Sequence, residues 1–172
     1  METISIPLSK GKLVLIAVGS FALLGLCLGL LFYGDQVPRM NSIFIKIVVA
    51  VGGLFFALCG VFGVQKFFDN KPGLIIDCQG IVDNSSAIAA GRIPWEEITG
   101  IRISEIASEK FLTILLLSPE KYAQGKGQIR AWLNSINTKM TGSPINISAN
   151  ALKISLNDLS GHLMSAWTSF KK

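Results

Sequence analysis

The stretch from Leu13 to Tyr33 contains no charged residue, and this feature constrains the chain more than any other. An α-helix of that length spans about 31 Å, close to the hydrocarbon thickness of a bilayer. Eight of its residues are Leu, which favours insertion. The run is too long for the apolar core of a signal peptide, and no small-x-small cleavage site follows it. The sequence therefore predicts an uncleaved transmembrane helix over residues 13–33.

A second charge-free run extends from Ile47 to Val64. It is short for a span, but residues 43–45 lengthen it if the Lys46 side chain extends to the membrane surface. The alternative is a buried core helix, which the run's apolar character on all sides and its pairing with a first span disfavour. We expect a transmembrane helix over residues 47–65, joined to the first by a short extracytoplasmic loop over residues 34–46.

Small residues recur at four-residue spacing in both predicted spans. Gly25 and Gly29 form one such pair, and Gly53 and Ala57 form another. This spacing places small residues on one helix stripe and lets two helices approach closely. The pattern favours packing of the two spans against each other, and the alternative is a homo-oligomer held together through these helices.

Basic residues near the span ends indicate orientation. Lysines lie on the terminal side of the two spans at positions 10, 12, 66 and 71, whereas Arg39 and Lys46 lie on the loop side. The bias predicts that both termini lie in the cytoplasm. It also makes Lys66 and Lys71 candidate contacts for anionic lipid, within a juxtamembrane linker over residues 66–72.

The sequence offers little for catalysis or metal binding. Cys27 and Cys59 lie inside the apolar runs, which leaves Cys78 alone in the remainder. His162 is the sole histidine, so neither a metal knuckle nor a base-activated nucleophile is indicated. The net charge of +5 is dispersed, which argues against nucleic-acid binding. We predict a protein that is not an enzyme and has no catalytic residue, cofactor or metal.

The remainder begins with strand-like patterns. Asp77 and Gly80 have the spacing of a tight turn between two strands. Pro94 cannot donate to a sheet, so the strand around Ile93 and Trp95 is expected at an edge or at a strand end. Further along, residues 101–104 alternate between apolar and polar, and Phe111–Leu117 is a continuous run suited to a buried strand.

Two amphipathic helices follow these strands. One has apolar residues on a single face at positions 129, 132, 133, 136 and 140, and the other at positions 156, 159, 163, 167 and 170. Ser155 and Asp158 have the spacing of a capping box at the start of the second helix. We expect Trp95, Trp132 and Trp167 to anchor the core of the domain.

Short strands closed by a C-terminal amphipathic helix, with two membrane helices ahead, resemble a bacterial membrane-protein family that carries a pleckstrin-homology-like domain. The matching positions are Leu74, Ile76, Asp77, Gly80, Ile81, Ile93, Trp95, Glu97 and Ile98. The resemblance implies a membrane-anchored α+β fold, with a two-helix transmembrane hairpin after an N-terminal segment, 1–12. An antiparallel β barrel or sandwich with a closing helix then occupies residues 73–172. The helix around residues 128–140 departs from this pattern as an insertion.

We therefore expect a protein-interaction module held at the lipid bilayer, whose partner is an unidentified protein. Strand addition, or a groove beside the terminal helix, would bind that partner. One alternative is an immunity-type protein that neutralises a membrane-directed bacterial toxin. A further alternative is a sensor of anionic lipid.

Overall fold

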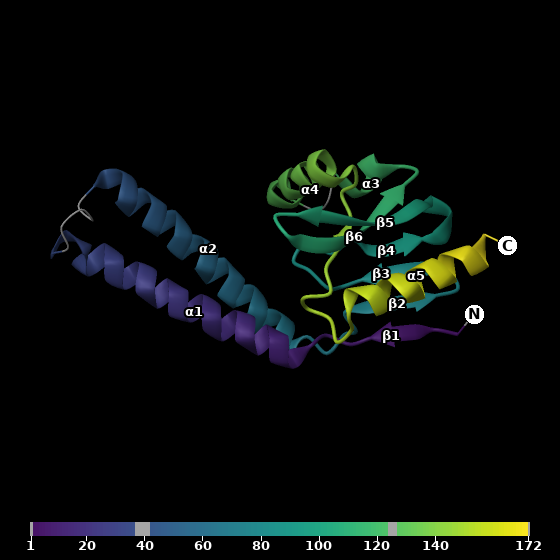
Figure 1. Ribbon diagram of the computed structural model, residues 1–172, viewed down its shortest axis with the longest axis horizontal. Coiled ribbons are helices and arrows are strands. Elements are labelled where there is room, and N and C mark those ends of the chain that lie inside the picture. The colour runs from purple at the N-terminus through teal and green to yellow at the C-terminus, as the bar shows by residue number, and fades with distance from the viewer. Residues whose placement is uncertain (1, 37–41, 124–126, 172) are drawn as a thin grey trace. The chain divides into compact units, whose positions relative to one another are not determined.

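The computed structural model describes residues 2–36, 42–123 and 127–171 of the 172-residue chain. The chain divides into two compact units. One is Lys10–Asn70, and the other is Met1–Ser9 together with Lys71–Lys172. We call the first the helical hairpin and the second the α+β unit. The hairpin is thus inserted into the sequence of the α+β unit (Figure 1).

The helical hairpin consists of α1, Lys10–Tyr33, a 3₁₀ turn at Gly34–Gln36, and α2, Ile43–Phe68. Both helices are long and apolar enough to cross a membrane. Only 11% of the most apolar part of α1 and 17% of that of α2 are buried, unlike the core helices of a soluble protein. Residues 37–41 of the predicted loop lie outside the described part of the chain.

Of the four small residues that the sequence predicts at the helix interface, some lie at the interface in the structure and others do not. A Cβ atom placed on Gly53 would lie 3.4 Å from Cβ of Cys27, so Gly53 packs against α1. Ala57 is half-buried. A Cβ atom on Gly25 or Gly29 would meet no described atom within 4 Å. These two glycines face away from α2, because a helix presents only one stripe to its neighbour.

The tightest approach of the two helices lies nearer the chain ends of the hairpin. A Cβ atom on Gly60 would lie 2.9 Å from ring atoms of Phe21, and one on Gly63 would lie 3.0 Å from the backbone nitrogen of Ala17. Contacts thus move back along α1 as residue numbers rise in α2, so the helices are antiparallel. Glycine is required where a side chain would fill the space that the partner helix occupies.

A lysine closes the open end of the hairpin. The ammonium group of Lys10, the first residue of α1, donates to the carbonyl oxygens of Phe67 and, at 2.6 Å, of Asp69. The last carbonyls of a helix lack partners within the helix and carry partial negative charge, so this cation satisfies and neutralises the end of α2. Lys66 forms an ion pair with Asp69 at 3.2 Å. Lys66, for which the sequence predicts a lipid contact, thus has a carboxylate partner within the protein.

The first sheet of the α+β unit contains four antiparallel strands in sequence order: β1, Ile4–Ile6; β2, Leu74–Asp77; β3, Gly80–Asp83; and β4, Gly91–Pro94. β1 precedes the hairpin in sequence, and its Ile4 and Ile6 pair with Ile76 and Leu74 of β2. The sequence alone predicts an N-terminal segment separate from the domain. Instead, this segment supplies an edge strand and two core side chains, Ile6 and Leu8.

The second sheet has the order β5–β6–β7, formed by β5, Ile98–Ile106, β6, Glu109–Leu116, and β7, Asn146–Ile147. The described strands thus form two separate sheets and not a closed barrel, which corrects the barrel form of the prediction. The first sheet ends at Pro94, which has no backbone N–H to donate to a neighbouring strand. A 3₁₀ turn at Trp95–Glu97 then connects it to the second sheet. The antiparallel α+β class predicted from the sequence is confirmed.

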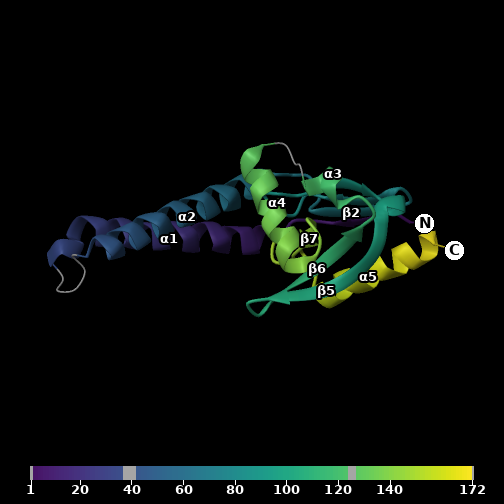
Figure 2. The same ribbon diagram turned by 90° about the horizontal axis from the view of Figure 1, so that it is seen from above.

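Three helices complete the α+β unit: α3, Pro119–Ala123, α4, Gln128–Thr141, and α5, Leu156–Phe170. Figure 2 shows α4 and α5 on different sides of the β5–β6 strands. α5 begins at Ser155, whose hydroxyl accepts the Asp158 backbone N–H, as the capping-box spacing predicts. Its Leu159 and Leu163 are fully buried. They join a core of apolar side chains from both sheets: Leu74, Ile76, Ile81, Ile93, Leu112, Ile114 and Ile147.

The three tryptophans differ in their surroundings. Trp95 is 1% exposed, donates to the Asp77 carbonyl at 2.9 Å, and stacks on Phe170. Trp167 is half-buried and donates to the carbonyl of Ile98. Trp132 of α4 is 63% exposed. The prediction that Trp132 anchors the core is wrong, because its side chain lies on the exposed side of α4.

Candidate functional site

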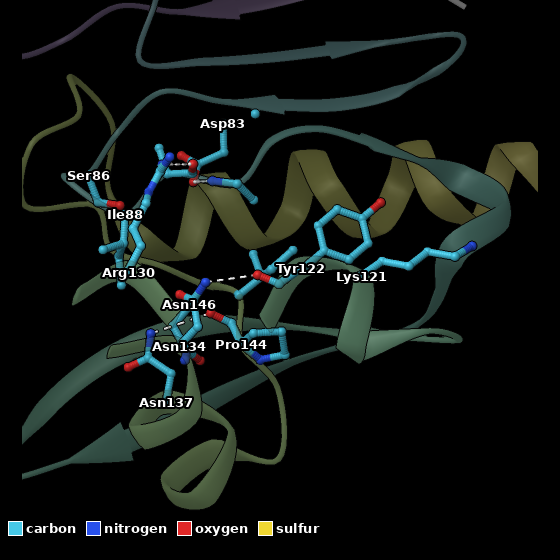
Figure 3. A pocket seen from close by; sticks show the side chains of 14 residues that line it. Asp83, Ser86, Ile88, Lys121, Tyr122, Arg130, Asn134, Asn137, Pro144 and Asn146 are labelled. Atoms are coloured by element: carbon cyan, nitrogen blue, oxygen red, sulfur yellow. Dashed lines mark hydrogen bonds between the residues drawn. The ribbon is translucent and has the colours of Figure 1, made fainter. Parts of the chain in front are cut away.

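A pocket of about 350 Å³, lined by both apolar and polar side chains, lies within the α+β unit. Its walls come from three separate segments: the loop from Asp83 to Gly91, the α3 and α4 helices, and Pro144–Asn146 (Figure 3). The volume is within the range of ligand-binding pockets. Sequence reasoning missed this site, because its residues are distant along the chain and form no recognised motif.

Asp83 shapes the loop wall of the pocket. It is 4% exposed, and its Oδ1 accepts the backbone N–H of Ser85 at 2.9 Å and the Ser85 hydroxyl at 2.6 Å. Its Oδ2 accepts the backbone N–H of Ala90 at 3.2 Å. A buried carboxyl group that accepts three hydrogen bonds has its polar atoms satisfied and fixes the surrounding backbone. Asp83 therefore closes the loop on itself, and its role is to hold the wall.

Arg130 reaches this loop from α4. Its Nη2 donates to the carbonyl oxygen of Ala89 at 2.5 Å, which ties the helix to the loop. Figure 3 shows its side chain running along the pocket wall toward Asp83. A guanidinium group has five N–H donors in a fixed plane. The structure assigns one of them to Ala89, so Arg130 is the main candidate donor for a ligand in the pocket.

Three asparagines form the opposite wall. The side-chain amide of Asn134 donates to the carbonyl of Tyr122 at 2.8 Å, that of Asn137 to Pro144 at 3.4 Å, and that of Asn146 to the Thr141 hydroxyl at 3.0 Å. These bonds use the N–H₂ groups to join α4 to its neighbours. An amide also has an acceptor oxygen with two lone pairs. The Asn146 oxygen already accepts the Thr113 hydroxyl at 2.7 Å, so the acceptors that this wall offers are mainly the oxygens of Asn134 and Asn137.

A charged pair lies at the α3 side. Lys121 and Glu97 form an ion pair at 2.5 Å, and this hydrogen bond raises the pKa of Lys121 above its ordinary value. The other oxygen of Glu97 is buried without a hydrogen-bond partner among the described residues. Burial raises the pKa of Tyr122, and the Glu97 charge raises it further. At neutral pH, Lys121 is therefore charged and Tyr122 keeps its proton.

The ionised groups at the pocket balance one another. Lys121 and Arg130 are positive, whereas Asp83 is negative and Glu97 is paired with Lys121. Such a site suits a neutral polar ligand that offers both carbonyl acceptors and N–H donors. His162 does not line the pocket, and it is exposed on α5.

No group of three or more His, Cys, Asp or Glu side chains that could hold a metal ion occurs among the described residues. Residues 124–126, between α3 and α4, lie outside the described part of the chain. No protein family, curated protein or solved structure matches the chain.

Proposed function

We propose that this chain is a membrane-anchored binding module, in which the helical hairpin crosses the inner membrane of a bacterium and the α+β unit binds a segment of another protein. The observation that supports the binding role is the pocket, whose mixed apolar and polar walls include a guanidinium group and amide side chains without excess charge. The module itself catalyses no reaction.

The same-side placement of the hairpin ends has structural support. β1 precedes α1 and β2 follows α2, yet the two strands pair in one sheet. Chain segments that share a sheet lie on one side of a membrane, because lipid-exposed sheet edges do not occur in the hydrocarbon region. The lysine distribution makes that side the cytoplasm. A fluorescent protein fused after Lys172 should fluoresce, and an alkaline phosphatase fused there should be inactive; the reverse result would contradict the orientation.

We further propose that the α+β unit is pleckstrin-homology-like. Its consecutive antiparallel strands and closing α5 support this, as does the buried Trp95 at the junction of the two sheets. The α3–α4 segment is then an insertion between β6 and β7, and it supplies one side of the pocket. The insertion gives this chain a binding site that the strands alone do not form.

The pocket chemistry favours a polypeptide segment as the ligand. A peptide backbone alternates carbonyl acceptors with N–H donors and carries no charge. Arg130 would donate to a carbonyl of such a segment, and the side-chain oxygens of Asn134 and Asn137 would accept from its N–H groups. The size of the pocket suits a few residues, so the remaining affinity must come from contacts around it.

A photo-crosslinking amino acid in place of Tyr122, in the full chain in cells, tests this role. We expect it to capture one discrete protein. The same amino acid in place of Met164, which is 43% exposed on α5, should not capture it.

Substitutions at two neighbouring positions test whether the capture depends on the pocket. Ser86→Phe fills the pocket that Ser86 lines and should abolish capture, whereas Ala87→Phe, at an exposed position outside the lining, should leave it unchanged. Capture that persists in Ser86→Phe would overturn the proposal, and so would equal capture from position 164.

A further inference from the structure

α4 turns its polar face toward the rest of the α+β unit. Asn134 is 6% exposed and Thr141 is 3% exposed. The side chains of Arg130, Asn134 and Asn137 bond to backbone carbonyls of the 83–91 loop, α3 and the segment before β7. Surface helices normally bury an apolar stripe and expose a polar one, so the packing of α4 is the reverse of the usual arrangement.

The opposite side of α4 carries apolar side chains that are exposed or half-buried. Trp132 is 63% exposed and Met140 is 56% exposed, with the half-buried Leu133 and Ile136 between them. Trp132, Ile136 and Met140 follow one another at four-residue spacing, so they form a stripe. Trp132 precedes Asn134 by two positions, which places the two side chains about 200° apart around the helix. We call Trp132, Leu133, Ile136 and Met140 the outer stripe.

A comparison with α5 shows that amphipathic sequence does not by itself produce an exposed stripe. α5 buries its apolar residues Leu159, Leu163 and Ala166 against the sheets. α4 has a similar apolar periodicity, but its Trp132 and Met140 are largely exposed and its Leu133 and Ile136 are only half-buried. A grouped apolar surface that includes a largely exposed Trp marks a binding surface, because water contact with such a surface is unfavourable.

Three features favour lipid as the occupant. α4 contains no acidic residue, and its charged residues are Arg130 and Lys139. Lys139 follows Ile136 by three positions and is exposed at the border of the outer stripe. Helices that lie in a membrane interface combine basic residues with an apolar face rich in Trp and Leu. The same chain carries two helices apolar enough to span the bilayer, which brings a membrane surface within reach.

We infer that α4 is an interfacial helix, which lays its outer stripe into the headgroup region of the membrane that the hairpin spans and places Lys139 beside anionic headgroups. This inference rests on the membrane anchoring in the proposed function. The polar face of α4 then keeps the pocket wall in place while the apolar face contacts lipid. Ligand binding and membrane contact thus share one helix.

The experiment uses the full chain in nanodiscs of phosphatidylcholine and phosphatidylglycerol. Its native cysteines are replaced by Ala, and one new cysteine carries an environment-sensitive fluorophore. Met140→Cys probes the outer stripe, and Met164→Cys, another exposed Met on a helix, is the matched control. Leu58→Cys, at a position 63% exposed on α2, reports on membrane insertion of the hairpin. Each label is tested with lipid-borne nitroxide and with aqueous iodide as quenchers.

We expect the label at position 140 to be quenched by the lipid-borne nitroxide and protected from iodide, and the label at position 164 to show the opposite. Lys139→Glu should reduce the nitroxide quenching at position 140. Iodide quenching at position 140 equal to that at 164 would overturn the inference. Protection of this label from both quenchers would also overturn the inference, because protein and not lipid would then cover the outer stripe.

The label at position 58 separates the two proposals. Nitroxide quenching at position 58 without quenching at 140 refutes the interfacial helix and leaves the membrane anchor intact. Iodide quenching at position 58 refutes the anchor itself, and with it the basis of the inference.

Discussion

Gly80 lies at the end of the turn that joins β2 to β3, with φ of +148°. A Cβ atom there would overlap the carbonyl oxygen of Ile93 on β4. Gly91, at the other end of the β3–β4 pair, also has positive φ, at +74°, but its Cβ would meet no described atom within 4 Å. The two glycines therefore separate the cost of backbone conformation from the cost of a close approach.

We predict that Gly80→Ala lowers the free energy of unfolding by at least about 3 kcal/mol, because conformational strain and overlap both act. Gly91→Ala should cost only about 1–2 kcal/mol, for the left-handed conformation alone. Thermal unfolding of both variants, followed by tryptophan fluorescence, measures the difference. Equal losses would show that β3 and β4 do not approach as described.

Asp77 and Arg92 form a two-bonded ion pair, with nitrogen–oxygen distances of 3.2 and 3.0 Å. The Arg92 hydrogen bonds hold the pKa of Asp77 below its ordinary value of 3.8, and N–H groups of the turn contribute further. Because the folded pKa is the lower one, ionised Asp77 stabilises the fold above about pH 4. This contribution is lost as the pH falls through the folded pKa.

We predict that Asp77→Asn is less stable than the native chain at neutral pH and that this difference shrinks toward about pH 3, where Asp77 is protonated in the unfolded state. Both groups are partly solvated, so the effect is modest. Urea unfolding midpoints at several pH values test it. A constant difference across the pH range would mean that the charge of Asp77 contributes nothing.

At the scale of secondary-structure elements, the hairpin contacts allow a direct test of register. A Cβ atom on Gly52 would lie 3.9 Å from Sγ of Cys27. In a chain with Cys59 and Cys78 replaced by Ala, Gly52→Cys should form a disulfide with Cys27 under mild oxidation, since this approach is near what a disulfide needs. Mass spectrometry of alkylated peptides measures the yield.

Two further substitutions in that chain distinguish the inner and outer glycines of the hairpin. Gly60→Leu should lower the disulfide yield, because its side chain would overlap the Phe21 ring at a cost of about 1–3 kcal/mol. Gly25→Leu should leave the yield unchanged, because Gly25 faces away from α2. If Gly25→Leu lowered the disulfide yield as much as Gly60→Leu, Gly25 would lie at the helix interface, as the sequence pattern predicts.

At the scale of the whole molecule, β1 makes the α+β unit discontinuous in sequence. Ile6 and Leu8 are 4% and 5% exposed, and Leu8 forms an isolated bridge with Leu152. The backbone N–H of Gly73 donates to the carbonyl of Ile6 at 2.9 Å, so the two points where the hairpin joins this unit are close together. A short linker can therefore replace the hairpin.

We predict that residues 2–9 joined to residues 71–172 through about six Gly and Ser residues form a folded, soluble protein. Residues 71–172 alone should be less stable by about 3–6 kcal/mol, because two buried aliphatic side chains and an edge strand are missing. Urea unfolding compares the two chains. Equal midpoints would show that β1 contributes nothing to the fold.

The amino-acid sequence alone predicts those elements whose signals are local. Charge-free runs predict α1 and α2, because their length and composition suit lipid regardless of tertiary contacts. The Asp77–Gly80 turn and the Ser155 cap of α5 were predicted from short-range hydrogen bonds that neighbouring residues supply. The alternation of apolar and polar residues predicts the strands, and Pro94 predicts the end of the strand that precedes Trp95.

Which surfaces contact each other became clear only from the three-dimensional packing. Periodicity correctly predicts that α4 has an apolar face, but it does not say whether that face turns inward, since this depends on what Asn134 and Arg130 can bond to elsewhere. The same holds for Gly25 and Gly29, which lie on a stripe that α2 does not touch. The three-residue strand β1 and the pocket could not be predicted from the sequence for a related reason. β1 pairs with β2, and the pocket is lined by segments that are many positions apart along the chain. A sequence fixes what each face is made of, while long-range packing decides what that face contacts.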